Sequence, residues 1–263
     1  MKALVFNGPR DIRYETFPDP SLETNNSVIL KVERCSICGS DLHMYHGENL
    51  GQASYGGDVT PFCVGHEFTG EIVEVGSQVH RFRVGQQVLA SGGAPCGKCK
   101  NCLSGHAQRC LGWTAFGLSG AMNGGQAEFV NVPMADLILQ PIPEGVTVEQ
   151  SILLTDAMCT AYFGLARTNL VPGDVVAVVG LGPIGLIGVE LAFTLGASEV
   201  FAIDPVSHRR DHAEALGATA LDPSEGLPLI MDKTRGAGVP RVFEASGSKD
   251  AVALAIKIAG RGS

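Results

Sequence analysis

The sequence predicts an α/β fold in two domains, the second of them a doubly wound parallel sheet. The chain has 263 residues. Domains average about 150 residues, so two domains with cores of their own are expected. From residue 174 onward, apolar strand segments alternate with helical segments, and a glycine-rich turn joins the first strand to the first helix. This alternation is typical of a parallel sheet covered by helices.

Composition excludes several classes of protein. Apolar residues make up 45% and charged residues 17%, which is globular composition, and the formal net charge is −8. An acidic balance argues against nucleic acid as a partner. No uncharged apolar run reaches the roughly 18 to 20 residues of a membrane span. Residues 1–8 predict a first strand rather than a signal peptide, so we expect a cytoplasmic protein that binds neither nucleic acid nor membrane.

The predicted parallel sheet begins with a buried strand and a nucleotide-type turn. Residues 175–179 are Val-Val-Ala-Val-Val, as a strand buried on both faces requires. Gly180, Gly182 and Gly185 follow in a G-x-G-x-x-G pattern, with an apolar helix to about residue 195. In such turns the glycines allow a tight bend, close approach of a pyrophosphate and close helix packing. The segment predicts a dinucleotide site.

Asp204 ends the next predicted strand, residues 200–203. A carboxylate there can accept hydrogen bonds from the adenosine ribose and would repel a 2′-phosphate, which favours NAD over NADP. Arg209 and Arg210 lie close in sequence and could partly reverse that preference. The alternative is that Asp204 only caps the end of its strand.

The rest of the second domain continues the alternation but stops early. We expect a helix at 206–216, a strand at 219–221, a strand at 239–245 and a helix at 249–259. That makes four strands, whereas a full dinucleotide-binding sheet has six. We therefore expect the doubly wound domain to be truncated before its last strands.

Four of the eight cysteines form one cluster. Cys96, Cys99 and Cys102 are separated by two residues each, and Cys110 follows after seven. This spacing lets four thiolates surround one ion, and a closed four-thiolate site predicts structural zinc. An iron–sulfur cluster is the main alternative, because such clusters also use two-residue spacers, and unrelated buried thiols are another.

A second group of metal-ligand types lies upstream and has mixed chemistry. Cys38 is followed by Asp41 and His43, and His66 and Glu67 come later. One thiolate, one imidazole and nearby carboxylates can leave a coordination position free for a substrate. Spacing alone leaves open whether His66 is a ligand or an ordinary buried histidine.

Taken together, these motifs resemble those of medium-chain, zinc-dependent alcohol dehydrogenases, from Met1 to the end of the chain. Residues 65–70, Gly-His-Glu-Phe-Thr-Gly, match that family's zinc signature, and the four clustered cysteines match its structural-zinc lobe. Residues 180–185, Gly-Leu-Gly-Pro-Ile-Gly, match its cofactor turn. The resemblance implies a mainly-β, GroES-like catalytic domain at 1–150 and a Rossmann domain at 151–263. It also implies a homodimer or homotetramer of the full-length chain.

The resemblance further implies two zinc ions per chain and NAD as cofactor, with NADP the less favoured alternative. The catalytic zinc would be held by Cys38, His66 and Asp156, with Cys159 as a second choice for the third ligand. Asp41 would orient His66, and Glu67 would lie behind the metal. Ser40 would take the proton of the alcohol and His43 would pass it to solvent, although a turn-capping serine and a solvent-facing histidine are the alternatives. The cofactor would contact Thr160, Gly180, Gly182, Pro183, Ile184, Gly185, Asp204 and Arg209.

The expected activity is hydride transfer between an alcohol, or its aldehyde or ketone, and NAD. Two alternatives remain: a polyol or sugar-alcohol dehydrogenase of the same family, and a non-catalytic, zinc-stabilised nucleotide-binding fragment. Gly39 stands where several family members carry a basic residue for the pyrophosphate. Gly92 and Gly93 suggest a roomy substrate pocket, which Trp113 and Phe116 could line unless they belong to the core.

Overall fold

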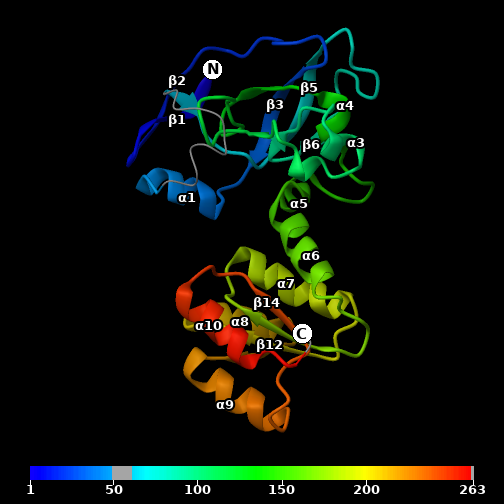
Figure 1. Ribbon diagram of the computed structural model, residues 1–263. Helices are drawn as coiled ribbons and strands as arrows, with labels where there is room; N and C mark the ends of the chain where they lie inside the picture. The colour runs from blue at the N-terminus through cyan, green and yellow to red at the C-terminus, as the bar shows by residue number, and fades with distance from the viewer. Residues whose placement is uncertain (49–60, 262–263) are drawn as a thin grey trace. The chain divides into compact units, whose positions relative to one another are not determined.

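A computed structural model describes residues 1–48 and 61–261 of the chain (Figure 1). The chain divides into two compact units, Met1–Asp156 and Ala157–Ser263. The first is mainly β and the second alternates strands with helices. The element order agrees with the predicted α/β fold class, in which a mainly-β domain precedes a domain built on a parallel sheet.

A five-stranded antiparallel sheet forms the centre of the first unit. Its strands run in the order β10-β6-β5-β3-β9. Their bounds are Leu139–Pro141, Gln87–Ala90, Phe68–Val75, Val28–Cys35 and Phe129–Val132. Phe68 and Phe116 pack edge to face in the core of this unit, with ring centroids 5.0 Å apart, and both are fully buried. This core fixes the ends of β3 and β5, where the candidate site begins.

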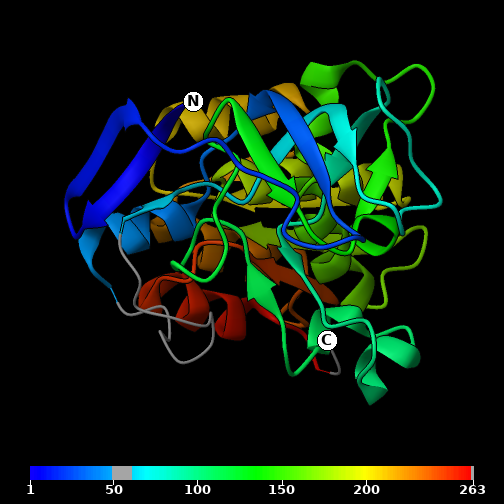
Figure 2. The same cartoon turned by 90° about the horizontal axis from the view of Figure 1, so that it is seen from above.

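A smaller sheet lies at the N-terminus. The predicted first strand is confirmed as β1 (Lys2–Gly8), which pairs with β2 (Asp11–Thr16) and β4 (Phe62–Cys63). The β1–β2 hairpin is the dark blue pair at the left of Figure 2. Its buried members Ala3 and Val5 pack against Cys63.

Short elements complete the first unit. The longest is α1, and the hairpin of β7 and β8 leads into and out of the cysteine-rich lobe. These elements are α1 (Gly39–His46), β7 (Gly93–Ala94), α3 (Lys100–Leu103), η1 (Ala107–Arg109), β8 (Thr114–Ala115), α4 (Ala135–Ile138), α5 (Val148–Ser151) and η2 (Ile152–Leu154).

The second unit contains the predicted parallel sheet. Its strand order is β13-β12-β11-β14, with bounds Thr219–Leu221, Glu199–Ile203, Val175–Val179 and Arg241–Glu244. Val176 and Val178 of β11 pack into one apolar cluster, and Ala177 and Val179 pack into another. Because neighbouring side chains of a strand point to opposite faces, β11 is buried on both sides, as predicted.

Helices α6 (Ala157–Arg167), α7 (Pro183–Thr194), α8 (Ser207–Ala215) and α10 (Lys249–Ile258) accompany this sheet. The sequence interpretation missed α9 (Pro223–Lys233). Asp222 caps α9 by accepting a hydrogen bond from Ser224 N at 3.0 Å, and Pro223 occupies its first turn. These are start signals, but Pro228 inside the helix obscured them.

Among the described residues, no helix combines the length and the apolar character needed to cross a membrane.

Candidate active site

The candidate metal site begins where β3 ends and α1 starts. Cys38 is the N-cap of α1. The Asp41 carboxylate, three residues on, accepts a hydrogen bond from Cys38 N at 2.9 Å. A carboxylate in this position satisfies a free amide and suits the positive end of the helix. The turn thereby fixes the thiol of Cys38 and buries Asp41, which is 5% exposed.

His66 is presented by a turn that only glycine allows. Gly65 has φ +94°, and a Cβ there would lie 2.4 Å from Cγ of Gln126. The imidazole of His66 is buried between two carboxylates. Its Nδ1 lies 3.4 Å from Asp41 Oδ1, and its Nε2 lies 3.4 Å from Asp156 Oδ2. Both Nδ1 and Asp41 Oδ1 are buried and make no hydrogen bond within the described structure.

Four donors converge at this point. One ligand atom each from Cys38, His66, Glu67 and Asp156 lies within 4.8 Å of all the others. Burial lowers the pKa of His66, but the nearby carboxylates of Asp156 and Asp41 and the thiol of Cys38 outweigh burial and raise it to about 12. The anionic groups thus favour a positive charge among them. A thiol, an imidazole and carboxylates are ligands that zinc accepts, so the residues present fit a zinc ion.

The structure brings together the predicted ligands Cys38, His66 and Asp156. Cys159, the second choice, is an exposed residue of α6. Glu67 joins the donor group as well. Glu67 is 6% exposed, and its carboxylate accepts a hydrogen bond from the hydroxyl of Ser36, a residue that no sequence motif pointed to.

Ser40 and His43 both lie on α1. Ser40 Oγ is 3.4 Å from His66 Nε2, at the edge of the donor group. His43 is one turn further along the helix, its Nδ1 pairs with the Glu48 carboxylate, and its side chain is half exposed. Residues three apart share a face of a helix, so Ser40 and His43 lead from the donor group toward solvent.

The four clustered cysteines also converge. Cys99 Sγ lies 3.4 Å from Cys102 Sγ and 3.8 Å from Cys110 Sγ. Tetrahedral zinc with Zn–S bonds of about 2.3 Å separates its sulfurs by about 3.8 Å. Cys110 Sγ further accepts hydrogen bonds from Cys96 N at 3.2 Å and Gly112 N at 3.3 Å. These spacings suit one ion, whereas an iron–sulfur cluster would spread its ligands over several irons.

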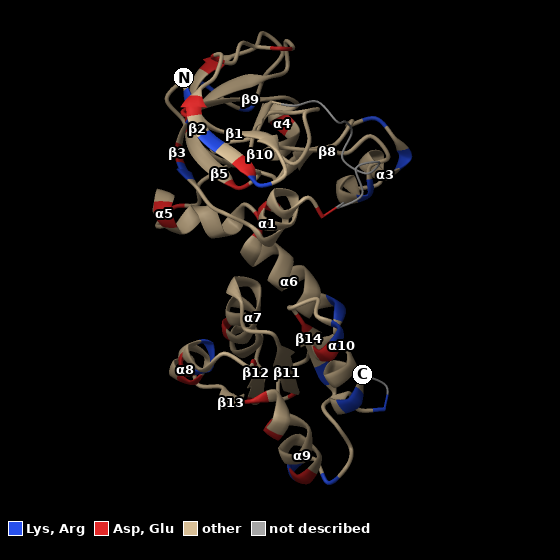
Figure 3. Cartoon of the chain, turned by 90° about the vertical axis from the view of Figure 1, so that its left-hand side faces the viewer, with Lys and Arg blue, Asp and Glu red and all other residues tan. Residues whose placement is uncertain are grey.

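Electrostatics in this lobe favour a cation. Backbone N–H groups of Cys102 and Leu111 lower the pKa of Cys99 to about 6. Burial, and then the neighbouring thiols Cys99 and Cys110, raise the pKa of Cys102 to about 12. Four thiols this close cannot all ionise without a metal. Lys and Arg residues lie around α3, which begins at Lys100 (Figure 3).

The glycine turn of the second unit has the predicted shape. Gly180 has φ +89°, and a Cβ on Gly185 would lie 1.8 Å from the carbonyl oxygen of Gly180. Gly182 is the N-cap of α7, with Pro183 and Ile184 in its first turn. A Cβ on Gly182 would meet no described atom within 4 Å, and no side chain caps the helix. This open helix N-terminus fits a pyrophosphate.

Asp204 stands beside this turn and is 3% exposed. Its carboxylate accepts hydrogen bonds from Leu181 N at 2.7 Å and Val206 N at 2.8 Å. Arg209 approaches it to 3.5 Å, while Arg210 donates to its backbone carbonyl at 2.7 Å. Asp204 therefore caps the strand end, and whether it also binds a ribose stays a prediction. Thr160 is exposed on α6.

The aromatic residues considered for the substrate pocket have different environments. Phe116 is fully buried in the core with Phe68. Trp113 is half-buried and covers Gly93, since a Cβ on Gly93 would lie 2.7 Å from its ring. A Cβ on Gly92 would lie 3.5 Å from the ring of His66. Gly92 thus leaves space directly beside the donor group.

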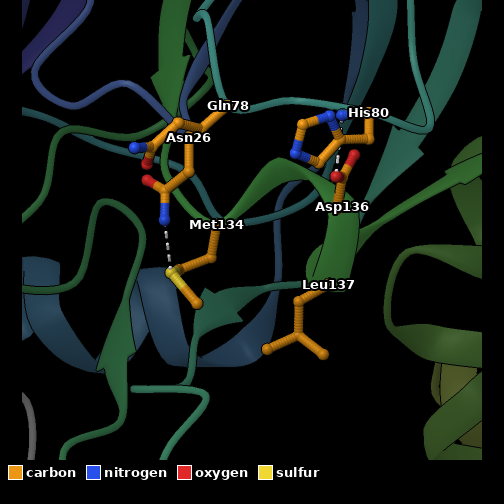
Figure 4. A pocket seen from close by; sticks show the side chains of 6 residues that line it. All are labelled: Asn26, Gln78, His80, Met134, Asp136 and Leu137. Atoms are coloured by element: carbon orange, nitrogen blue, oxygen red, sulfur yellow. Dashed lines mark hydrogen bonds between the residues drawn. The ribbon is translucent and has the colours of Figure 1, made fainter.

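A cavity of about 440 Å³ lies elsewhere on the first unit (Figure 4). Met134 on its wall accepts a hydrogen bond from Asn26 Nδ2 at 2.9 Å, and the Asp136 carboxylate accepts one from His80 N at 2.9 Å. None of the predicted site residues lines this cavity.

Comparison with known proteins identifies the family. Residues 24–144 match the model of the alcohol dehydrogenase GroES-like domain, and residues 183–263 match that of zinc-binding dehydrogenases. The sorbitol dehydrogenase of Bacillus subtilis is 32% identical over 265 residues, covering 100% of this chain and 73% of that protein. The chain belongs to the medium-chain, zinc-dependent alcohol dehydrogenases. Members of this family are oxidoreductases that use a nicotinamide cofactor.

Two further relatives support this assignment. A probable zinc-binding alcohol dehydrogenase of Mycobacterium tuberculosis is 39% identical over 94% of this chain, which spans 62% of that protein. The solved structure of the alcohol dehydrogenase TADH from Thermus sp. ATN1 superposes with a TM-score of 0.91 at 32% identity, over 99% of this chain and 75% of its own.

Proposed function

We propose that this chain carries the zinc and cofactor sites of an NAD-dependent dehydrogenase that oxidises an alcohol or polyol, or reduces the corresponding carbonyl compound. The observation that carries the proposal is the convergence of Cys38, His66 and Asp156 within 4.8 Å. One thiolate, one carboxylate and one neutral imidazole balance the charge of Zn²⁺. Three protein ligands are also the pattern of catalytic rather than structural zinc, because they leave one position free.

The chemistry then divides between the metal and the protein. Zinc, when bound, polarises an alcohol oxygen and lowers the pKa of the hydroxyl group. A bound nicotinamide cofactor would accept the hydrogen of the alcohol carbon together with its electron pair, so the hydroxyl proton would have to leave separately. Ser40 would relay this proton, accepting it at Oγ while giving up its own hydroxyl proton toward His43; its Oγ lies 3.4 Å from His66 Nε2 at the donor group. His43, half exposed and paired with Glu48, passes it to water.

The second zinc site is structural in this proposal. Cys96, Cys99, Cys102 and Cys110 supply four thiolates, which leave no position for a substrate. The chain would hold two zinc ions, both bound by residues of the first unit.

The cofactor choice rests on Asp204. Its carboxylate lies beside the glycine turn, and a second negative charge from a 2′-phosphate would be repelled there. NAD is therefore the proposed cofactor, with Thr160 beside its nicotinamide and Arg209 beside its ribose.

The proposal is tested by following NADH absorbance with the zinc-loaded chain and a panel of primary, secondary and polyhydric alcohols. Turnover that a chelator abolishes and added zinc restores supports the proposal and names the substrate class. Turnover that persists in the fully chelated protein would contradict it. A tight nicotinamide site with a single bound zinc would favour the non-catalytic alternative.

A further inference from the structure

Glu67 is a donor that the proposed metal centre does not need. Its carboxylate lies within 4.8 Å of the ligand atoms of Cys38, His66 and Asp156. The latter three already neutralise Zn²⁺. A fourth ligand from Glu67 would add a negative charge and complete the tetrahedron, so that no position remained for an alcohol oxygen. Another contact must therefore keep the Glu67 carboxylate out of the coordination sphere while substrate binds.

Ser36 is placed to do this. Cys35 and Phe68 form the last registered pair of β3 and β5, so Ser36 and Glu67 are the next residues outward on the two chains. Ser36 N donates to the Glu67 carbonyl at 3.2 Å, which extends the ladder by one pair. Cross-strand neighbours of a sheet share a face. The hydroxyl of Ser36 consequently reaches the carboxylate of Glu67 and donates to its Oε2.

Ser36 is itself held in place. Gln126 Nε2 donates to the Ser36 carbonyl at 3.0 Å, and Gln126 is 8% exposed. The aliphatic part of Gln126 packs on Gly65, where no Cβ would fit. The same buried glutamine thus fixes both the turn that presents His66 and the residue that holds Glu67.

We propose that Ser36 is a positioning residue that keeps the fourth coordination position of the zinc open. Its hydroxyl and the metal would compete for one group, the carboxylate of Glu67, whose Oε2 accepts the hydrogen bond from Ser36. While Ser36 donates to this atom, Glu67 stays outside the coordination sphere. Without the hydroxyl, Glu67 binds the metal and an exogenous ligand has to displace it. This inference rests on the proposed zinc centre of Cys38, His66 and Asp156.

The test uses the full chain loaded with Co²⁺ in place of zinc and imidazole as the exogenous ligand. Imidazole binding at an open position changes the visible spectrum of cobalt, whereas the closed four-cysteine site does not respond. A hydrogen bond to a charged group changes binding by about tenfold or more. We expect Ser36→Ala to weaken the apparent affinity for imidazole by about that factor. Ser36→Thr, which keeps the hydroxyl, should bind like the unmodified chain.

The double variant Ser36→Ala/Glu67→Gln is the decisive control. An amide is a poor competitor for the metal, so this variant should regain the affinity of the unmodified chain. An unchanged affinity in Ser36→Ala overturns the inference, and so does a loss that Glu67→Gln does not restore. If the unmodified chain shows no imidazole-sensitive cobalt band, the proposed function fails, and this inference fails with it. Spectra of the four-cysteine site report in each variant that the fold is intact.

Discussion

Asp41 Oδ1 lies 3.4 Å from His66 Nδ1, and both atoms are buried. Asp41 simultaneously accepts a hydrogen bond from Cys38 N, so one carboxylate supports two neighbouring ligands of the proposed zinc. A carboxylate on the outer nitrogen of a histidine fixes its tautomer and directs the other nitrogen to the metal. In this chain the directed atom is Nε2, which faces Asp156.

Asp41→Asn should weaken zinc binding at this site by about 10- to 100-fold, because an amide orients the imidazole less strongly. Zinc affinity is measured by competition with a chromophoric chelator. The four-cysteine site is the internal control and should keep its metal. Equal zinc affinity before and after the change would mean that Asp41 serves only as a helix cap.

Asp156→Ala should remove the zinc of the mixed site and leave one zinc per chain. Asp156→Cys should retain it, because a thiolate is an equivalent zinc ligand. Cys159→Ser is the matched control and should bind zinc normally. Retention of full metal by Asp156→Ala, with loss in Cys159→Ser, would show that Cys159 is the third ligand.

The four-cysteine lobe should depend on its metal for stability. Cys99→Ser removes a thiol whose pKa is lowered to about 6 by backbone N–H groups, and it should abolish zinc binding in the lobe. Because the binding free energy of a structural metal is folding free energy, the Tm of the first unit should fall by more than about 5 °C. Leu111→Ala, an exposed neighbour, should leave the Tm unchanged. A Cys99→Ser protein with normal Tm and two zinc ions would contradict a structural role.

Asp204→Asn should have two separable effects. The amide cannot accept both backbone hydrogen bonds, from Leu181 N and Val206 N, so the free energy of unfolding should fall by about 1–3 kcal/mol. Loss of the negative charge should also reduce discrimination against NADP. Fluorescence titration with NADH and NADPH measures the second effect, and Arg209→Gln should shift it the opposite way. Tighter binding of NADPH than NADH by the unmodified chain would refute the NAD assignment.

Asp174 links pH to the stability of the second unit. The pKa of Asp174 is lowered, first by the hydrogen bond from Val171 N and then by Arg241, whose Nε lies 2.8 Å away. A carboxyl group with a depressed folded-state pKa contributes stability above its unfolded pKa of about 4 and loses it as pH falls further. Asp174→Asn should therefore lower the free energy of unfolding at pH 7. Below pH 4, the free energy of unfolding of this variant should change less with pH than that of the unmodified chain. The coupling would be contradicted if the difference in free energy of unfolding between the two proteins, measured by denaturation, were the same at every pH.

The second unit could be predicted from sequence more completely than the first. Strand β11, the turn after it and helix α7 follow from local patterns, because apolar runs and glycines act within a few residues. Helix α9 was missed because Pro228 masks the start signals of Asp222 and Pro223. A proline within a helix removes one hydrogen bond, yet α9 continues through Pro228 and buries Ile230.

The candidate site could be predicted from sequence less completely, because tertiary structure brings most of its residues together. The four clustered cysteines lie within fifteen residues, so their spacing sufficed to predict a metal site. Asp156 is ninety residues from His66, and only the family resemblance pointed to it. Ser36 could not be inferred, since its contact with Glu67 depends on the register of β3 against β5. For Phe116 the sequence left two alternatives, a substrate pocket and the core, and the structure shows that it belongs to the core.

The most direct test of this account is the number of zinc ions per chain, counted by elemental analysis in the unmodified protein and in Asp156→Ala. The account predicts two ions in the first and one in the second, with zinc-dependent NADH formation only where there are two. A single ion in the unmodified protein, or dehydrogenase activity that survives in Asp156→Ala, would contradict it.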